Sequence, residues 1–303
     1  MSALDPRKLF RRLAEDIPKP LQRHLFVVGS LAAAYHFRAE LERRAVNTKD
    51  ADVVVYPAGN VGSAKALALR LLDLGWTRTA KCFPAAARSP ADGLRAFRLN
   101  PPKSRDYFIE LLGVPATGQW KKVVWVPVRL PDGWYGVGCH RFMRLASFRR
   151  LRSAEGLEYA SPSMMALANL LSHPDLGRQR MSDPVGGRKL LRSAKDLGRV
   201  LALAWLSGRE SAAGWLEDWQ AGLRQCFPAR WRTLAARAGS GLQALLDDRE
   251  ALDEAVVTTE VGLLNGRGVD AENLRAVGLQ LTADVLRPLA ERARRPGGVP
   301  RTG

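Results

Sequence analysis

Two aspartates, Asp50 and Asp52, are spaced so that they can act together on one substrate. They open the apolar run Val53-Val54-Val55, which is short, β-branched and bounded by breakers, so it predicts a strand. Alternate residues of a strand point to the same side, so both carboxylates project together. Carboxylates this close repel, and one takes up a proton unless a cation lies between them. A divalent metal keeps both ionised, and Mg²⁺ suits carboxylates and phosphates while it retains several waters.

A glycine and a serine, Gly29 and Ser30, supply the other half of this candidate site. They follow the apolar run Leu25 to Val28 and precede a segment rich in Ala and Leu, which predicts a strand, a tight turn and a helix. Glycine lets the backbone turn sharply close to a ligand, and the first amides of a helix favour an anion. A phosphate held there would turn its oxygens toward a metal on the two aspartates.

The order of Gly-Ser, helix and Asp-x-Asp resembles the nucleotidyltransferase fold of the DNA polymerase β superfamily. Residues Thr48 to Asp52 are similar to the Thr-x-Asp-Ile-Asp motif of its AbiEii-like toxin branch. The resemblance covers residues 24–112 well and residues 160–206 loosely. It implies metal-dependent transfer of a nucleotidyl group from an NTP, with two Mg²⁺ ions. It also implies a third carboxylate on a later strand, for which Glu110, an acid in the apolar run Tyr107 to Leu112, is the best candidate.

A basic helix expected from Arg188 to Leu206 carries a second part of the resemblance. Its segment Arg192 to Leu197 is similar to the Arg-x-Lys-Asp helix of AbiEii-like proteins, whose basic residues face the cleft. By that likeness Lys195 contacts the triphosphate, and Asp196 braces it or assists the acceptor. The alternative is a solvated basic face, on which this pair contributes little. The residues that we assign to nucleotide binding are Gly29, Ser30, Lys49, Arg192, Lys195 and Asp196.

The fold class that follows is α+β (α/β), a nucleotidyltransferase-type mixed sheet flanked by helices and followed by an all-helical C-terminal domain. We divide the chain into an N-terminal amphipathic helix (1–23), a catalytic domain (24–157), a helical domain (158–295) and a flexible tail (296–303). The N-terminal helix has an apolar face with which to pack on the domain, and a basic arm on RNA is the alternative. Three tryptophans of the helical domain are expected in its core: Trp215, Trp219 and Trp231.

Short strands are expected around Glu110 and beyond it. If Leu94 to Leu99 pairs with Tyr107 to Leu112 as a hairpin, Glu110 is brought alongside the two aspartates, a placement that comes from the resemblance. A further hairpin is expected from Lys121 to Cys139, turning at Pro131-Asp132. After it, residues 140–152 contain five arginines and two interleaved phenylalanines. These suit phosphate contact with base stacking, and equally an ordinary surface with the phenylalanines turned inward.

The charge of the chain indicates the class of partner. Its 47 Lys and Arg against 30 Asp and Glu give a net charge of +17, which favours a polyanion over a neutral small molecule. RNA is therefore the expected acceptor, with the tRNA 3′ end as one candidate. The resemblance to the AbiEii-like branch further implies a toxin of a toxin–antitoxin or phage-defence system, with an antitoxin protein as a partner. The three cysteines show no zinc or disulfide pattern. Without a signal segment or a membrane-spanning run, we expect a cytoplasmic protein with no membrane partner.

Two other function classes fit the same residues. A catalytically weak module that binds RNA or nucleotide is suggested by Asn169, where the family usually has a lysine, and by Glu110, where an aspartate is commoner. A steep salt dependence of RNA binding without a Mg²⁺-dependent product would favour it. A small-molecule nucleotidyltransferase of the aminoglycoside-modifying kind would need an acidic cleft for a cationic drug, and the excess of arginine argues against it.

Overall fold

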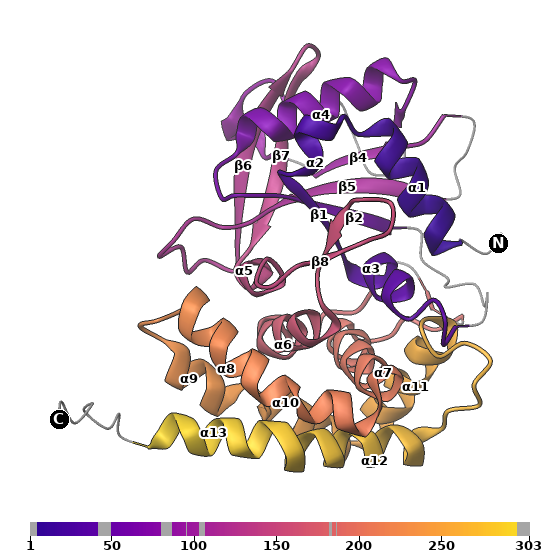
Figure 1. Ribbon diagram of the computed structural model, residues 1–303, viewed down its shortest axis with the longest axis vertical. Helices are drawn as coiled ribbons and strands as arrows, with labels where there is room; N and C mark the ends of the chain where they lie inside the picture. Colours follow the sequence, from indigo (N-terminus) through magenta and orange to yellow (C-terminus); the bar gives the residue numbers. More distant parts are fainter. Residues whose placement is uncertain are drawn as a thin grey trace. The chain divides into compact units, whose positions relative to one another are not determined.

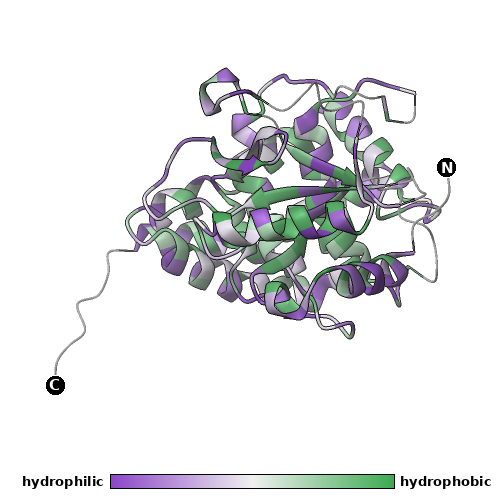
Figure 2. Ribbon diagram, turned by 90° about the horizontal axis from the view of Figure 1, so that it is seen from above, coloured by the Kyte–Doolittle hydropathy of each residue, from purple (hydrophilic) through white to green (hydrophobic). Residues whose placement is uncertain are grey.

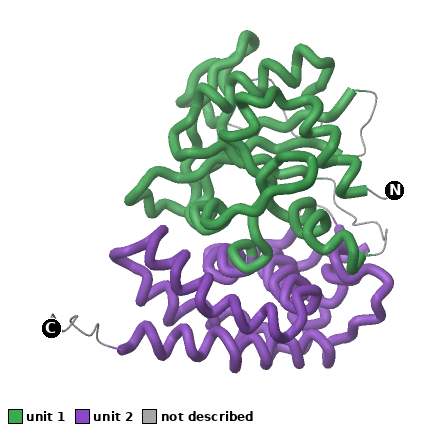
Figure 3. The backbone as a smooth tube through the Cα atoms, viewed as in Figure 1, with its two compact units in different colours: residues 1–165 green, residues 166–303 purple. Residues whose placement is uncertain are grey.

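The computed structural model describes residues 5–41, 50–79, 87–94, 96–102, 107–181, 184–185 and 187–295. The chain forms two compact units, Met1–Met165 and Ala166–Gly303 (Figure 1, Figure 3). The first contains a mixed sheet with helices, and the second is helical, so the predicted mixed α+β class with a helical C-terminal region is confirmed. Lys49 and the predicted tail 296–303 lie outside the described residues.

The sheet of the first unit has nine strands in the described part of the chain. Seven follow the order β3-β4-β5-β2-β1-β9-β8, while β7 pairs with β5 and β6 pairs with β7. Strand β2 is antiparallel to β1 and parallel to β5, and both predicted hairpins, β4–β5 and β6–β7, are present. The strands are β1 Leu25–Val28, β2 Asp50–Val55, β3 Thr77–Arg78, β4 Phe97–Asn100, β5 Phe108–Gly113, β6 Val123–Leu130, β7 Gly133–His140, β8 Leu151–Arg152 and β9 Glu158–Tyr159.

The central strands are apolar on both faces because both faces of the sheet are covered there. Every residue of β1 is buried, and so are Val53, Val54 and Val55 of β2, and Figure 2 shows hydrophobic residues along the middle of the sheet. Helix α4 (Val61–Asp73) begins at Asn60, whose side chain accepts a hydrogen bond from the Ser63 amide. It packs through Ala64 near Val55, so it covers the face to which the odd-numbered residues of β2 point.

The N-terminal helix packs on the sheet unit, as its amphipathic pattern predicts. In α1 (Pro6–Asp16) Leu9, Phe10 and Leu13 are buried, and Phe10 stacks on Tyr35 at a centroid distance of 4.0 Å. Asp16 accepts a hydrogen bond from the Trp76 indole at 3.0 Å, which ties the end of the helix to the domain. The other helices of this unit are α2 Lys19–Gln22, α3 Gly29–His36, the 3-10 turn η1 Pro90–Asp92 and α5 Met143–Ala146, and α6 Pro162–Ser172 leads into the second unit.

The second unit is built of helices joined by short turns. Trp219 is fully buried and Trp215 nearly so, as expected, whereas Trp231 is half-buried and lies under the guanidinium groups of Arg224 and Arg232. The prediction of a buried Trp231 was wrong because cation–π contacts shield an exposed ring face. The elements are η2 His173–Asp175, α7 Arg192–Ala213, α8 Trp215–Cys226, α9 Trp231–Arg237, α10 Ser240–Asp247, α11 Arg249–Val261, α12 Ala271–Leu281, η3 Thr282–Leu286 and α13 Arg287–Arg294.

The long basic helix starts later than predicted. Helix α7 begins at Arg192, and Arg188 lies outside it in a β-bridge with Val185. The cause lies 63 residues away in sequence, where Glu254 of α11 accepts a hydrogen bond from the Leu191 amide at 2.7 Å. A buried carboxylate at this position acts as a helix cap, so it determines where α7 begins. Helix α7 is interrupted at Gly208, whose φ of 71° is non-helical.

The sequence predicts neither a cysteine site nor a membrane-spanning segment, and the structure bears on both only for the residues that it describes. Cys139 forms no disulfide, burial raises its pKa to about 11, and Cys82 lies outside the described part of the chain. Among the described helices, none combines the length and the apolar character that crossing a bilayer requires.

Candidate functional site

The sheet brings the three predicted carboxylates to one face. In the parallel pairing of β2 and β5, Asp52 lies opposite Glu110 and Asp50 lies opposite Phe108. Opposite residues on neighbouring strands point to the same side, with their Cα atoms about 4.8 Å apart. Asp50, Asp52 and Glu110 therefore share a face, the one opposite the face that α4 covers. The hairpin that was expected to place Glu110 here does so.

The start of α3 lies against the same carboxylates. Val28 pairs with Asp52 across β1 and β2, so the next residue, Gly29, turns off the sheet beside Asp52. Gly29 has a φ of +74°, and a Cβ at this position would lie 2.7 Å from the Asp52 Oδ2 atom. Both facts require glycine. The N-cap residue Val28 makes no side-chain capping bond, and the amides that begin α3 lie beside the carboxylates.

Glu110 has a cationic neighbour that the sequence analysis missed. Arg98 of β4 lies directly opposite Glu110 in the antiparallel pairing with β5, and its Nε donates to Oε2 at 2.6 Å. The guanidinium also lies over the Phe108 ring at 5.1 Å. The expected hairpin contains both residues, but their register depends on a connection longer than a tight turn. Such a connection does not determine register, so the sequence shows no signal for this pair.

The electrostatics of Glu110 suit a group that exchanges a proton. Burial raises the pKa of Glu110, the adjacent Arg98 charge and hydrogen bond oppose that rise, and the charge of Asp50 adds to it. The side chain of Glu110 is 15% exposed, so burial is the larger cause. A carboxyl group with a raised pKa is a better proton acceptor than an ordinary exposed glutamate.

The carboxylates fit a metal as a pair rather than as a triad. No group of three or more His, Cys, Asp or Glu side chains within the described ranges is placed to hold a metal ion, and Glu110 is already paired with Arg98. Asp50 and Asp52, two hard oxygen donors on one face, fit Mg²⁺, which binds through one or two carboxylates together with substrate phosphates and water. The role of Glu110 as a third ligand stays a prediction.

The predicted residues of α7 form a cluster of their own in the second unit. Arg192 is exposed, while Lys195 and Asp196 are half-buried. Burial raises the pKa of Asp196, and the charges of Arg199, Lys195, Arg192 and His173 oppose that rise. His173, whose own pKa is lowered by burial, is thus within electrostatic reach of Asp196. Asp196 is therefore more than a surface partner of Lys195, and the predicted contact of this helix with triphosphate stays a prediction.

The arginine-rich stretch at residues 140–152 is partly absorbed by the fold. Arg141 is buried, with its guanidinium over the Trp120 ring at 4.7 Å and over Phe142 at 4.9 Å. Arg150 pairs with Glu158 at 2.6 Å, and Phe142 and Phe148 are buried. The alternative of phenylalanines turned inward is correct here. These two arginines brace the domain rather than present a surface for phosphate.

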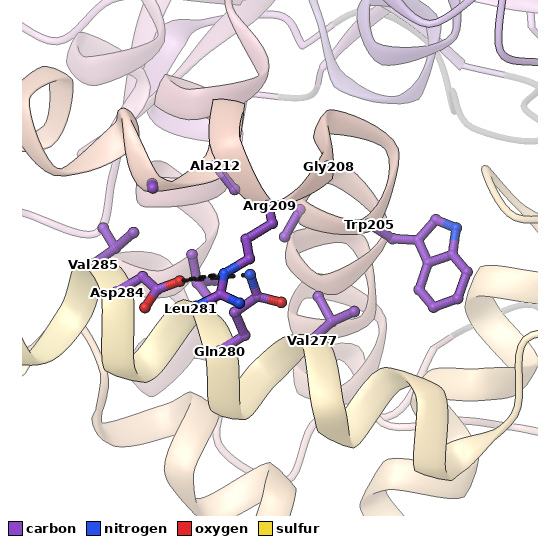
Figure 4. A pocket seen from close by; sticks show the side chains of 11 residues that line it. Trp205, Gly208, Arg209, Ala212, Val277, Gln280, Leu281, Asp284 and Val285 are labelled. Atoms are coloured by element: carbon purple, nitrogen blue, oxygen red, sulfur yellow. Dashed lines mark hydrogen bonds and ion pairs between the residues drawn. The ribbon is translucent and has the colours of Figure 1, made fainter.

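A cavity of about 200 Å³ lies within the helical unit, between α7, α12 and η3 (Figure 4). Its lining is mainly apolar, and Arg209 and Asp284 form an ion pair at 3.5 Å on its wall. It lies at the interruption of α7, since Gly208 belongs to the lining. None of the residues that the sequence assigned to nucleotide binding lines this cavity.

Comparisons with known proteins leave the family undecided. No family model matches the sequence, and no curated protein matches it. Among solved structures, a STING-associated CdnE c-di-GMP synthase from Capnocytophaga granulosa is similar at 10% identity and a TM-score of 0.24, over 97% of this chain and 84% of that one. The Bradyrhizobium diazoefficiens CD-NTase CdnG in complex with GTP is similar at 13% identity and a TM-score of 0.23, over 96% and 87%. TM-scores this low support no functional argument, so we infer the function from the geometry of the site.

Proposed function

We propose that this protein is a Mg²⁺-dependent nucleotidyltransferase that moves a nucleotidyl group from an NTP to a hydroxyl group of RNA. The observation that carries the proposal is the placement of Asp50, Asp52 and Glu110 on one face of the sheet, beside the start of α3. Two carboxylates, a helix N-terminus and a third acid with a raised pKa are a set of groups that serves phosphoryl chemistry.

The chain's own groups divide the work between the donor and the acceptor. The amides of Gly29 and Ser30 bind the triphosphate at the start of α3, where the helix dipole favours negative charge. Asp50 and Asp52 would hold Mg²⁺, which neutralises the phosphate charge when it is bound. Lys49, Arg192, Lys195 and Asp196 are proposed to complete the nucleotide site, as the resemblance implies.

Glu110 accepts the proton of the reaction. The acceptor O–H bond breaks, its proton passes to the Glu110 carboxylate, and the oxygen forms a bond to the α-phosphorus of the NTP. The bond from that phosphorus to the bridging oxygen breaks, and pyrophosphate leaves with the electron pair. Arg98 Nε donates its hydrogen bond to Oε2 of Glu110, and we assign the proton to the other oxygen, Oε1.

The test is label transfer. The purified chain is incubated with each α-labelled NTP, Mg²⁺ and total cellular RNA, alongside Asp50→Ala, Asp52→Ala and a matched control, Asp73→Ala, at an exposed aspartate on α4. Label should move to RNA with the wild type and with Asp73→Ala, and should fall to background with the other two. Full turnover by Asp52→Ala would overturn the assignment, and the labelled species would identify the NTP and the RNA class.

A binding module that has lost turnover is the second candidate. The ion pair of Glu110 with Arg98 favours it, because an engaged carboxylate is a weaker ligand and base than an unengaged one. It predicts RNA binding with a steep salt slope and no Mg²⁺-dependent product. The small-molecule transferase, the AbiEii-like branch, the toxin role, an antitoxin partner and a cytoplasmic location stay predictions from the sequence.

A further inference from the structure

One aromatic side chain of the sheet unit is turned to solvent. Trp125 of β6 is 42% exposed, and within the described residues the one other large hydrophobic side chain that is exposed is Leu279 in the helical unit. An indole is among the most costly side chains to leave in water, and at exposed positions it commonly takes part in recognition. Trp125 therefore calls for an explanation that the packing of the domain does not provide.

The indole lies flat on a stretch of backbone that glycine keeps open. A Cβ on Gly136 would lie 2.6 Å from the Trp125 Cε3 atom, and one on Gly138 would lie 3.4 Å from Cζ3. Neither glycine has a positive φ, so the backbone conformation does not require glycine at these positions. The space for the ring requires glycine at position 136, whereas a Cβ on Gly138 would only make ordinary van der Waals contact with the ring. One face of the indole rests on β7, and the opposite face supplies the exposed area.

The register of the sheet places this ring on the face of the carboxylates. Glu110 and Leu112 are alternate residues of β5, Leu112 lies opposite Gly138, and Gly138 lies opposite Trp125. Alternate residues of a strand, and residues paired across neighbouring strands, point to the same side of the sheet, so Trp125 and Glu110 share a face. Two strand spacings and two residues separate their Cα atoms, which amounts to about 12 Å. One nucleotide and the two side chains span that interval.

The ring lies on the acceptor side of the site rather than on the donor side. The strands run β1, β2, β5, β7 and β6 across the sheet, so Gly29 and Ser30 follow β1 on one side of the aspartates. Glu110 and then Trp125 lie on the other side. A triphosphate bound at the start of α3 therefore has its leaving group away from Trp125. The hydroxyl that Glu110 deprotonates comes from the side on which the indole lies.

The charge around the ring favours a polyanion over an apolar peptide. Arg129, four residues on along β6, is exposed on the same side, and its guanidinium lies over the Trp134 ring at 5.7 Å. Arg98 lies on the same face, next to Glu110. A single flat ring with cations on the same face of the sheet suits a stacked base of single-stranded nucleic acid, whereas a peptide groove needs several apolar side chains.

We propose that Trp125 is the stacking platform for the nucleobase of the acceptor, at the reacting end of a single-stranded RNA. This rests on the proposed function, because it takes the direction of the acceptor from the role of Glu110. The flat ring contacts a π-face that every base has, so the platform tolerates sequence. The ring makes no phosphate contact.

The test measures binding of a labelled single-stranded RNA to the full chain by fluorescence polarisation, without NTP or Mg²⁺. Trp125→Ala should weaken binding about 5- to 150-fold, the range for loss of one base–aromatic stack, and Trp125→Phe should lose much less. The salt slope should stay the same, because no phosphate contact is lost. Leu279→Ala, the matched exposed hydrophobic residue, should bind as the wild type does.

The possible outcomes of this test and of the label-transfer assay have different consequences. Equal binding by Trp125→Ala and the wild type, or no binding of RNA by the wild type, would overturn the platform even if label transfer to another acceptor occurred. Stacking without any transfer would keep the contact of Trp125 with an RNA base, and it would overturn the proposed reaction and with it the identification of that base as the acceptor's. A loss of NTP affinity in Trp125→Ala would place the ring on the donor side and contradict the proposal.

A mononucleotide competitor distinguishes a free nucleotide acceptor from an RNA end, and the latter is expected. Circular dichroism confirms that each variant is folded.

Discussion

Two arginine–glutamate pairs of the sheet unit have the same bond and different surroundings. In both, the arginine Nε donates to the glutamate Oε2 at 2.6 Å: Arg98 to Glu110, and Arg150 to Glu158. Arg150 also stacks over Tyr56 at 4.3 Å and Phe26 at 5.4 Å, and its NH1 donates to the Ser147 carbonyl. Every side of that guanidinium is used to hold the β8–β9 hairpin on the sheet.

The Arg98–Glu110 pair has a further charge beside it. The aspartate side chain of Asp50 raises the pKa of Glu110, and burial acts in the same direction. An identical bond can thus brace a fold or control a reactive acid, and the neighbouring charges decide which. The bond length alone does not distinguish the two roles, so variants of each pair must be compared.

The largest expected effect is on turnover. Glu110→Gln removes the proton acceptor and should lower label transfer by about 10²- to 10⁴-fold, the usual contribution of a general base. Glu158→Gln keeps a hydrogen-bond acceptor for Arg150 and should leave transfer within a factor of about three of the wild type, measured as initial rate at saturating NTP. Equal losses in the two variants would remove the distinction between the pairs.

The next effect is on stability and runs in the opposite order. Arg150→Ala loses two cation–π contacts and two hydrogen bonds, so the free energy of unfolding should fall by about 2 kcal/mol. Arg98→Ala should cost less, because Glu110 can take up a proton once its cation is gone. Urea unfolding at neutral pH measures both. A larger loss for Arg98→Ala would show that its pair is the structural one.

The pH dependence of stability sharpens the comparison. The pKa of Glu110 is raised in the folded chain, so between its ordinary pKa and the raised value the folded state binds more protons than the unfolded state. The free energy of unfolding therefore falls as pH rises through that window. Glu110→Gln should lose this decline, and its stability relative to the wild type should increase from acid to neutral pH. Parallel unfolding curves at pH 4, 5, 6 and 7 would contradict the prediction.

The smallest effect belongs to an exposed pair that serves as a reference. Arg78 and Asp132 are joined at 2.7 Å, with side chains 34% and 39% exposed. Solvent screens such pairs, so Arg78→Ala should lower the free energy of unfolding by at most about 1 kcal/mol. Added salt should shrink the difference from the wild type. If Arg78→Ala lowered the free energy of unfolding as much as Arg150→Ala does, solvent screening would not be what distinguishes the Arg78–Asp132 pair from the Arg150–Glu158 pair.

The sequence by itself determined the parts of the site that depend on local periodicity and conformation. Asp50 and Asp52 share a face because strand side chains alternate, and the confirmed elements at α3, β2, β5 and the β6–β7 hairpin follow from apolar runs and breakers. Gly29 stands where the backbone needs a positive φ beside Asp52. Each of these depends on a few neighbouring residues.

Only the tertiary structure decided what depends on register and on distant partners. Arg98 meets Glu110 because β4 and β5 pair with one register out of several, and α7 starts at Arg192 because Glu254, far along the chain, bonds the Leu191 amide. Trp125 shares a face with the three carboxylates because three strand pairings add up across the sheet. The residue pattern within one segment does not predict such pairings, because packing between segments supplies the free energy that selects them.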